Sequence, residues 1–407
     1  MFGMFGMFGR KNNLISAVLL VSIICLVYSL AVAQGLTPEQ ELGERLYFDE
    51  NLSLNRNQSC ASCHDPGFGF VDPDNVRNLT PVSDGSIVTL SGTRNAPSAA
   101  YAAFSPFFHW DGIEGLYVGG QFWDGRANTL AEQAAGPFIN PVEMAMPNKW
   151  AVVSRLKEDH YYREAFNDVY GLDLNMILWF NPRIPFVPPG VLEIYDRMAT
   201  AIGEFEKTRE FNKFSSKFDY YLAGDPEAAL SETEERGLQL FKNTDPGGGK
   251  CILCHPIDST FAPDGTKIPP LFTDFTYDNL GIPKNHDIPG DPPTDFGLGG
   301  RPDIAEKDPD GLQRGKFKVM TLRNIEITLP YGHNGFFKTL KDIVHFYNTR
   351  DVPDAGWDPP EVPKNVNTEE LGDLGLSDED EDAIVEFLKT LTDGFKGPQH
   401  VTFPPFP

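Results

Sequence analysis

The pattern C-x-x-C-H occurs twice in the sequence, as Cys60-Ala61-Ser62-Cys63-His64 and as Cys251-Ile252-Leu253-Cys254-His255. These two motifs are the strongest indication of the fold. This pattern is the attachment signature of c-type haem. Two thiols one helical turn apart add to the vinyl groups of one porphyrin, and the adjacent histidine then reaches the iron from the proximal side. The motifs therefore predict two covalently bound haems. The predicted anchors are Cys60, Cys63, Cys251 and Cys254, and the predicted iron ligands are His64 and His255.

Paired cysteines have two other common uses, a shared zinc site and disulfide bonds. Zinc ribbons usually place their pairs about 15–20 residues apart, whereas 187 residues (251 − 63 − 1) separate Cys63 from Cys251 here. Disulfides would not require a histidine after each pair. Haem attachment explains both the spacing and the histidines.

The first 33 residues predict export. They contain no acidic residue, and Arg10 and Lys11 precede an apolar run over residues 14–32 that leads to Ala31-Val32-Ala33. This is the layout of a secretory signal peptide with a small-x-small cleavage site. A membrane anchor is the alternative, since the run is nearly long enough to span a bilayer. We expect residues 1–33 to be a cleaved signal peptide, which leaves a periplasmic protein without a stable membrane span, either soluble or held at a surface.

The composition narrows the classes of partner. The chain has 407 residues, enough for two or three domains, with 34 basic and 58 acidic side chains and a formal net charge of −24. Such a charge argues against nucleic acid as a partner and favours basic proteins. The 38 glycines and 34 prolines predict long irregular loops.

The segments outside the motifs are predicted to be mainly helical. Apolar spacing near 3.6 and capping residues predict helices over residues 38–47, 192–214, 232–241 and 377–391. The segments 41–48 and 232–241 each lead into one of the haem motifs. This parallel predicts two related halves.

Several further segments resemble the bacterial dihaem cytochrome c peroxidase and MauG family. They are TRNAP at 93–97, FWDGR at 122–126, EQA at 132–134 with EM at 143–144, FTDF at 272–275, YDNLG at 277–281, TLRN at 321–324 and TLPYGHNG at 328–335. The resemblance spans residues 38–395 and implies a mainly α fold of two cytochrome c-like helical domains with one haem each. It assigns residues 36–205 to an N-terminal domain with the peroxidatic haem, 206–396 to a C-terminal domain with the electron-transfer haem, and 397–407 to a tail.

The resemblance implies that the N-terminal haem reacts with hydrogen peroxide. Gln133 and Glu143 keep the ten-residue spacing of the family's distal pair: Glu143 would move the peroxide proton and Gln133 would orient bound peroxide. Otherwise Glu143 would be an ordinary surface acid. Classical family peroxidases close the distal side with a histidine before the R-N-A-P segment, but no histidine occurs between His64 and His109, and Thr80 lies in that stretch. We therefore expect an open iron position in the oxidised protein.

The second haem needs another ligand besides His255, and four downstream residues are candidates: Met320, His333, His345 and Tyr347. Tyr347 lies on an apolar helical stripe, and His345 is about 200° around the helix from it, on a face with charged side chains. In the family this ligand falls seventeen residues after the proline of the T-x-P-Y segment, and 347 − 330 = 17. The resemblance thus implies Tyr347, as in the MauG branch, with Met320 as the alternative.

The resemblance also implies a relay residue and a calcium ion between the domains. Trp123 matches the tryptophan that couples the two haems, although Trp110, in a similar segment, is an alternative bridge. The matching calcium ligands are Asn95, Thr328 and Pro330, the last two through backbone carbonyls. Oxygen ligands suit this hard cation.

Three functions remain open from the sequence. In the MauG type, peroxide forms a high-valent dihaem state that oxidises a Trp or Tyr on a partner protein. The alternative is a cytochrome c peroxidase that reduces hydrogen peroxide to water with electrons from a small basic cytochrome c or a copper protein. The third is an electron carrier without catalysis, which the Gln133 and Glu143 pair disfavours. The MauG branch has a surface tryptophan at the position of Gly249, so we expect a different exit route for oxidising equivalents.

Overall fold

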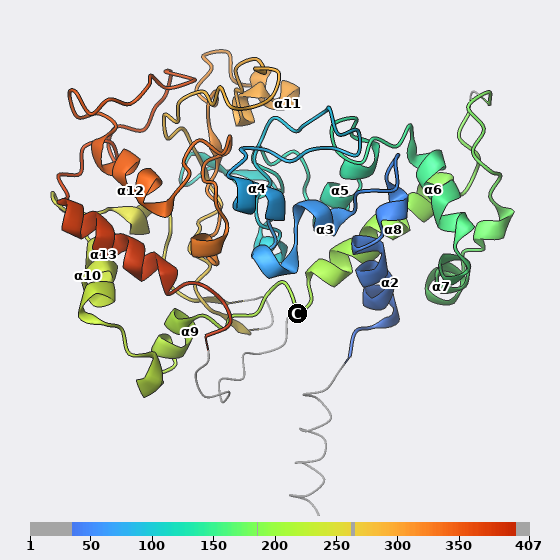
Figure 1. The fold of residues 1–407 in the computed structure, drawn as a ribbon, viewed down its shortest axis with the longest axis horizontal. Coiled ribbons are helices and arrows are strands. Elements are labelled where there is room, and N and C mark those ends of the chain that lie inside the picture. Colours follow the sequence, from blue (N-terminus) through green and yellow to red (C-terminus); the bar gives the residue numbers. More distant parts are fainter. Residues whose placement is uncertain (1–34, 185, 262–264, 396–407) are drawn as a thin grey trace, which may run out of the picture. The chain divides into compact units, whose positions relative to one another are not determined.

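The computed structural model describes residues 35–184, 186–261 and 265–395 (Figure 1). The signal peptide predicted at 1–33 and the tail predicted at 397–407 lie outside these residues. The described residues from Glu39 onwards form one compact unit, and every contact below lies inside it. Within the described ranges, no helix is both long and apolar enough to cross a membrane.

The fold is mainly helical, as predicted. The α-helices are α2 (Pro38–Tyr47), α3 (Cys60–Cys63), α4 (Pro73–Asn78), α5 (Leu130–Ala134), α6 (Lys149–Glu158), α7 (His160–Tyr170), α8 (Val191–Glu206), α9 (Lys217–Leu222), α10 (Glu232–Lys242), α11 (Pro302–Ala305), α12 (Leu340–Thr349) and α13 (Asp378–Lys389). The 3-10 turns are η1 (Glu50–Leu52), η2 (Pro66–Phe68), η3 (Ala102–Phe104), η4 (Pro137–Ile139), η5 (Leu174–Met176), η6 (Pro226–Ala228), η7 (Cys251–Leu253), η8 (Leu298–Gly300) and η9 (Ile325–Ile327).

The strands form short antiparallel ribbons and no larger sheet among the described residues. The pairs are β1 (His109–Asp111) with β2 (Leu116–Val118), β3 (Thr260–Phe261) with β4 (Lys267–Ile268), and β5 (Tyr277–Asp278) with β6 (Phe317–Lys318). In the first ribbon Trp110 faces Tyr117, and in the third Tyr277 faces Lys318. Long irregular loops connect these ribbons to the helices, in agreement with the glycine and proline content.

The two halves repeat one helix crossing. α2 lies against α8 at Gly43, and α10 lies against α13 at Gly237. A side chain on Gly43 would collide with the backbone carbonyl of Ala201, and one on Gly237 would collide with that of Ala383. Each helix pair can therefore approach this closely only because glycine stands at the crossing. The repeat supports two related halves, and the boundary proposed at residues 205/206 remains a prediction.

The helix predicted at residues 192–214 ends earlier, at Glu206. The Asn212 side-chain amide donates to the backbone carbonyls of Glu206 and Thr208. These bonds satisfy carbonyl groups at the carboxyl end of the helix, where the chain turns. Phe211 and Phe214 lie in the loop after the helix and are buried there. The apolar spacing in the sequence therefore continues beyond the end of the helix. The helical prediction was therefore too long at its carboxyl end.

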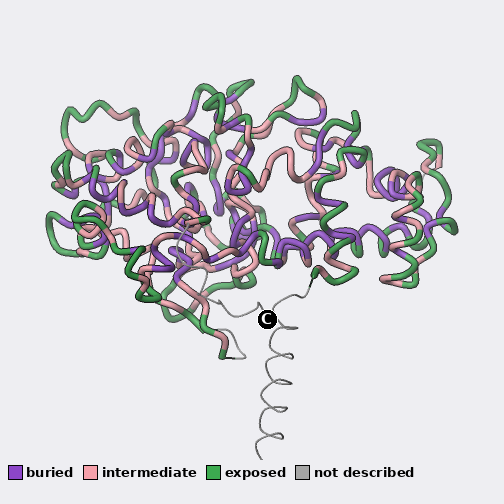
Figure 2. Tube along the Cα trace, turned by 60° about the horizontal axis from the view of Figure 1, so that its bottom comes forward, coloured by how far each residue is buried: buried purple, intermediate pink, exposed green. Residues whose placement is uncertain are grey.

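Apolar side chains of α9, α10, α12 and α13 form the core of the second half, and this core also receives Phe272 and Phe337. Figure 2 shows buried stretches along the helices, with exposed chain mainly in the peripheral loops. A fully buried ion pair fastens this core: the Arg323 guanidinium donates to both carboxylate oxygens of Asp219, at 2.9 and 2.8 Å. Arg323 Nε also donates to the Pro270 carbonyl at 2.7 Å. The pair thereby ties α9 to the segment that follows the second motif.

Candidate haem and peroxide site

The first motif opens into a cavity of about 620 Å³. Cys60 and Cys63 from α3, and His64 after it, line this cavity. The predicted peroxide residues Gln133 and Glu143 line the same cavity from α5 and the loop after it. The structure therefore brings the N-terminal attachment motif and both distal candidates into one space.

The second motif lines another cavity, of about 240 Å³. Cys251, Cys254 and His255 form part of its wall, together with Tyr347 and Met320. Because the two cysteine pairs lie in different cavities, the shared zinc site is ruled out. No disulfide joins any of the four cysteines in this structure, which argues against the disulfide alternative.

Both motif histidines are held in the same way. His64 Nδ1 lies 3.1 Å from the Phe70 carbonyl oxygen, and His255 Nδ1 lies 2.7 Å from that of Phe272. A carbonyl only accepts, so Nδ1 carries the proton and the Nε2 lone pair is available to a metal. Burial lowers the pKa of both imidazoles, that of His255 to about 4, which keeps them neutral as a metal ligand must be.

The surroundings of the motifs fit a porphyrin. Burial raises the pKa of the Cys63 and Cys251 thiols to about 12 and raises those of Cys60 and Cys254 too. Raised thiol pKa values of this origin indicate apolar surroundings, which a porphyrin ring requires. In the second cavity the apolar stripe of α12, which includes Leu340, Ile343 and Val344, forms one wall.

Glu143 is held beside the first cavity by its own loop. Its Oε1 accepts a 2.7 Å hydrogen bond from Asn140 Nδ2. Burial raises the pKa of Glu143, although the charge of Arg126 and the bond from Asn140 oppose this shift. A carboxyl with a raised pKa can both take up and release a proton nearer to neutral pH. The structure thus excludes the surface-acid interpretation, and the catalytic role of Glu143 and Gln133 remains a prediction.

Trp123 lies between the two cavities and lines both. Its indole Nε1 donates to the Asn95 carbonyl at 2.9 Å. His333 also lines both cavities, stacks on Phe317 at 3.5 Å and meets Trp123 edge-on at 6.5 Å. Trp110 lies instead on the β1–β2 ribbon and is exposed. Of the two tryptophans considered as a bridge, Trp123 has the position that a bridge requires.

Met320 and Tyr347 reach the second cavity from different elements. The residues on either side of Met320 are bonded to the segment that holds His255, since Thr273 Oγ1 donates to the Val319 carbonyl and Thr321 Oγ1 donates to that of Leu271. Phe272, which orients His255, lies within that segment. The backbone around Met320 is therefore fastened to the segment that orients His255, whereas Tyr347 enters the cavity from α12.

The other two candidate ligands are less suitable. His345 is exposed and its Nδ1 pairs with Glu381 at 2.9 Å. His333 is buried between the cavities, as described above. Tyr347 thus remains the strongest candidate for the second ligand.

The predicted calcium ligands Asn95, Thr328 and Pro330 all border the second cavity. The Asn95 amide is fixed because its Nδ2 donates to the Pro81 carbonyl at 3.1 Å, which orients Oδ1 as the remaining ligand atom. Oxygen donors of this kind match calcium.

Two buried charged residues in the cavities were not anticipated from the sequence. Glu206 lines the first cavity, and burial raises its pKa to about 8. Lys318 lines the second, and burial lowers its pKa to about 7. For Glu206 a signal existed, because it lies four residues after the buried Ile202 on the apolar stripe of α8. Lys318 lies in a two-residue strand that carries no such periodic signal.

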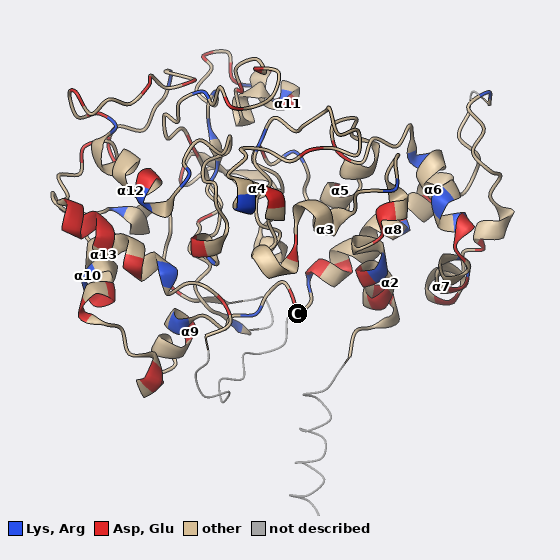
Figure 3. Cartoon of the chain, viewed as in Figure 1, with Lys and Arg blue, Asp and Glu red and all other residues tan. Residues whose placement is uncertain are grey.

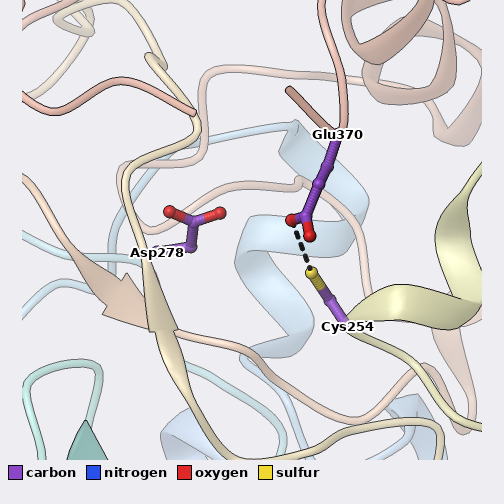
Figure 4. A group of neighbouring side chains, drawn as sticks. All are labelled: Cys254, Asp278 and Glu370. Carbon is purple, nitrogen blue, oxygen red and sulfur yellow. Dashed lines mark hydrogen bonds between the residues drawn. The ribbon is translucent and has the colours of Figure 1, made fainter. Parts of the chain in front are cut away.

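Two carboxylates flank the second attachment motif, as Figure 4 shows. Cys254, Asp278 and Glu370 approach one another closely enough to hold a metal ion. Asn367 Nδ2 bridges the carboxylates, with bonds of 2.5 Å to Asp278 and 2.8 Å to Glu370. Because Cys254 belongs to the attachment motif, we interpret the group as the polar edge of the haem cavity.

Comparisons with known proteins agree with this geometry. The family model described as "Di-haem cytochrome c peroxidase" matches residues 37–227. The methylamine utilization protein MauG of Paracoccus denitrificans is 39% identical over 86% of this chain and 88% of its own length. The cytochrome c551 peroxidase of Nitrosomonas europaea is 34% identical over 88% of this chain and 82% of its own length. The crystal structure of the diheme peroxidase BthA from Burkholderia thailandensis aligns with a TM-score of 0.74 and 32% identity, over 88% of this chain and 87% of that chain.

Proposed function

The chain belongs to the di-haem cytochrome c peroxidase and MauG family, and from this premise we propose that it is an exported peroxidase of the MauG type. It would use hydrogen peroxide to oxidise a Trp or Tyr side chain of a partner protein. As a family member it is a haem peroxidase-type oxidoreductase with two c-type haems. The observation that carries the finer proposal is Tyr347 in the second cavity, on a different element from the segment that orients His255.

Two bound haems would supply the redox chemistry of the reaction with peroxide. The chain's own residues prepare this reaction in the first cavity. Gln133 would donate its amide N–H to peroxide and fix its orientation. Glu143 would accept the first peroxide proton and return it to the leaving oxygen; since its Oε1 is engaged by Asn140, the proton would be carried on Oε2.

Trp123 would connect the cavities, because its ring lines both. Its N–H bond to Asn95 holds the ring in place and links the relay to the proposed calcium site. We propose that calcium bound by Asn95, Thr328 and Pro330 fixes the mutual position of the relay and the second cavity. Removal of calcium should then impair communication between the haems.

Tyr347 is expected to determine how the protein responds to peroxide. A tyrosinate is an anionic donor that stabilises an oxidised iron, whereas a thioether favours the ferrous state. Burial raises the pKa of the free Tyr347 hydroxyl, but a bound cation favours the deprotonated form. Tyr347→Met should therefore raise the reduction potential of the second haem and abolish a stable oxidised product after peroxide addition. Spectroelectrochemistry measures the first change and stopped-flow spectra the second.

The matched control for Tyr347→Met is Tyr347→Phe, which keeps the ring but removes the ligand atom. Both variants should lose the stable oxidised product, while only the methionine variant restores a six-coordinate ferrous spectrum. Spectra and potential that remain those of the parent protein in both variants would refute Tyr347 as a ligand.

A second candidate function is reduction of hydrogen peroxide to water with electrons from a small basic cytochrome or a copper protein. The acidic surface favours it: Figure 3 shows acidic residues along α13, whose first turn contains Asp378, Glu379 and Asp380 besides the buried Glu381. Such a surface attracts basic partners. The two functions can be separated by mass spectrometry, after peroxide treatment, of exported proteins that co-purify with this chain or are encoded next to it. An oxidised Trp or Tyr on a partner supports the MauG type, whereas rapid turnover of reduced cytochrome c without a modified partner supports the peroxidase.

A further inference from the structure

We propose that Trp110 is the surface end of an electron route that leads through Tyr117, Phe108 and Tyr277 to the turn carrying Trp123. The proposal rests on the proposed peroxidase function and adds to it the place where electrons enter from a partner. It assigns a role to the β1–β2 ribbon, which lies outside both haem cavities.

Four aromatic rings follow one another from the surface inwards. Trp110 and Tyr117 face each other across the ribbon, with ring centroids 4.9 Å apart. Tyr117 stacks on Phe108 at 5.1 Å, with the planes 6° apart, and Phe108 meets Tyr277 edge-on at 5.9 Å. Short ring-to-ring steps of this kind allow an electron to cross a protein in stages. Phe108 would serve as a tunnelling contact between two oxidisable tyrosines.

The inner end of the series lies beside the relay turn. The Tyr277 hydroxyl donates to the Gly119 carbonyl and occupies the space that a side chain on Gly125 would need. Gly125 lies two residues after Trp123. Across the third ribbon Tyr277 pairs with Lys318, whose backbone N–H donates to the Trp123 carbonyl at 2.9 Å. Two independent contacts thus join the ring series to the turn that reaches both cavities.

The series is held rigidly. Tyr277 belongs to a small buried cluster with Leu298 and Ile304, and Phe108 and Tyr117 pack against this cluster. The Arg301 guanidinium lies 4.2 Å from the Phe108 ring and donates to the Asp124 carbonyl at 3.0 Å. A rigid path suits electron transfer because it needs no rearrangement of the rings.

The outer end of the series is open to a partner. Trp110 is 50% exposed, and Phe107 and Ile113 are exposed on the same hairpin. Asp111 accepts hydrogen bonds from the backbone N–H groups of Ile113 and Glu114, which fixes the hairpin tip and places acidic side chains next to the indole. An electron donor with a basic rim could therefore approach Trp110 closely.

The redox balance of the route is simple. Each electron that leaves Trp110 reduces the peroxide-oxidised haem pair by one equivalent, and the indole N–H proton passes to water. An electron from the partner and a proton from water then restore Trp110. Two electrons and two protons taken up in this way complete the reduction of one hydrogen peroxide to two water molecules.

The test is peptide mapping of the holoprotein after stoichiometric hydrogen peroxide without a partner. Trp179 is the internal control: it is 54% exposed, and the Lys157 ammonium, 4.6 Å from its ring centroid, disfavours a positive charge there. We expect modification of Trp110 with Trp179 intact. Equal modification of both would indicate direct surface oxidation and would overturn the proposal.

Tyr117→Phe provides a second test, because it keeps the ring stack but removes an oxidisable step. We expect modification of Trp110 to fall in Tyr117→Phe and to persist in Trp179→Phe. Undiminished modification of Trp110 in Tyr117→Phe would overturn the route. A haem spectrum that does not respond to peroxide would instead refute the proposed function itself, so the two failures are distinguishable.

Discussion

Glu143→Gln is expected to slow the reaction of the holoprotein with hydrogen peroxide by about 10²- to 10⁴-fold, the usual contribution of a positioned acid–base group. Glutamine keeps the size of the side chain and can still accept the hydrogen bond from Asn140. It cannot take up the peroxide proton. The loss therefore measures proton transfer and not packing, and stopped-flow absorbance of the first haem reports it directly.

The pH dependence should change with the same substitution. Burial raises the pKa of Glu143, so in the parent protein the rate should fall as the pH drops through a value above the ordinary glutamate pKa of about 4.3. This acidic limb should disappear in Glu143→Gln. Glu132→Gln is the matched control, because Glu132 is exposed and its carboxylate caps the Asn128 N–H. A parent-like rate in Glu143→Gln would remove Glu143 from the mechanism.

Arg323→Met should cost about 3–5 kcal/mol of unfolding free energy, because it leaves the Asp219 carboxylate buried without its partner. Both side chains have 0% exposure. The guanidinium also lies against the Phe214 ring, at 4.4 Å, and holds the Pro270 carbonyl. Chemical denaturation of the holoprotein gives the difference. Arg236→Met is the control, since Arg236 pairs with Asp380 at the surface and should contribute about 0–1 kcal/mol.

The pH profile of stability distinguishes a lost ion pair from a lost contact. Burial alone would raise the pKa of Asp219, but the Arg323 charge and the bonds from Arg323 and Ser216 outweigh it and leave the pKa lowered. A carboxyl whose pKa is lowered on folding stabilises the protein above its unfolded pKa, and this stability is lost as the pH falls through the folded pKa. Arg323→Met should remove this acid-sensitive contribution of Asp219 to the free energy of unfolding. A variant that keeps the parent's acid profile would contradict the account.

Local signals explain what could be predicted from the sequence. The segments 38–47 and 232–241 form helices as expected, because their apolar spacing is local, and in α10 Ser231 and Glu234 form a capping box. The C-x-x-C-H motifs were equally local. Their thiols and histidines converge on two cavities.

Long-range packing explains what could not be predicted. The overlong helix at 192–214 arose because Phe211 is buried by stacking on Phe70, at 4.2 Å, and not by a helical face. The place of His333 between the cavities depends on its stacking against Phe317. The attachment of the segment around Met320 to the segment after the second motif depends on hydrogen bonds to residues about 50 positions away along the chain, Leu271 and Thr273. No pattern within one segment carries such information.

The most direct test of the account is the addition of one equivalent of hydrogen peroxide to the fully oxidised holoprotein, followed by rapid-scan visible spectroscopy. We predict an immediate reaction without any reductant and with spectral changes at both haems. In the proposed mechanism peroxide would reach an open first iron, Trp123 would couple the two cavities and Tyr347 would stabilise the oxidised second haem. A protein that reacts only after prior one-electron reduction would contradict this account and would belong with the reductively activated peroxidases.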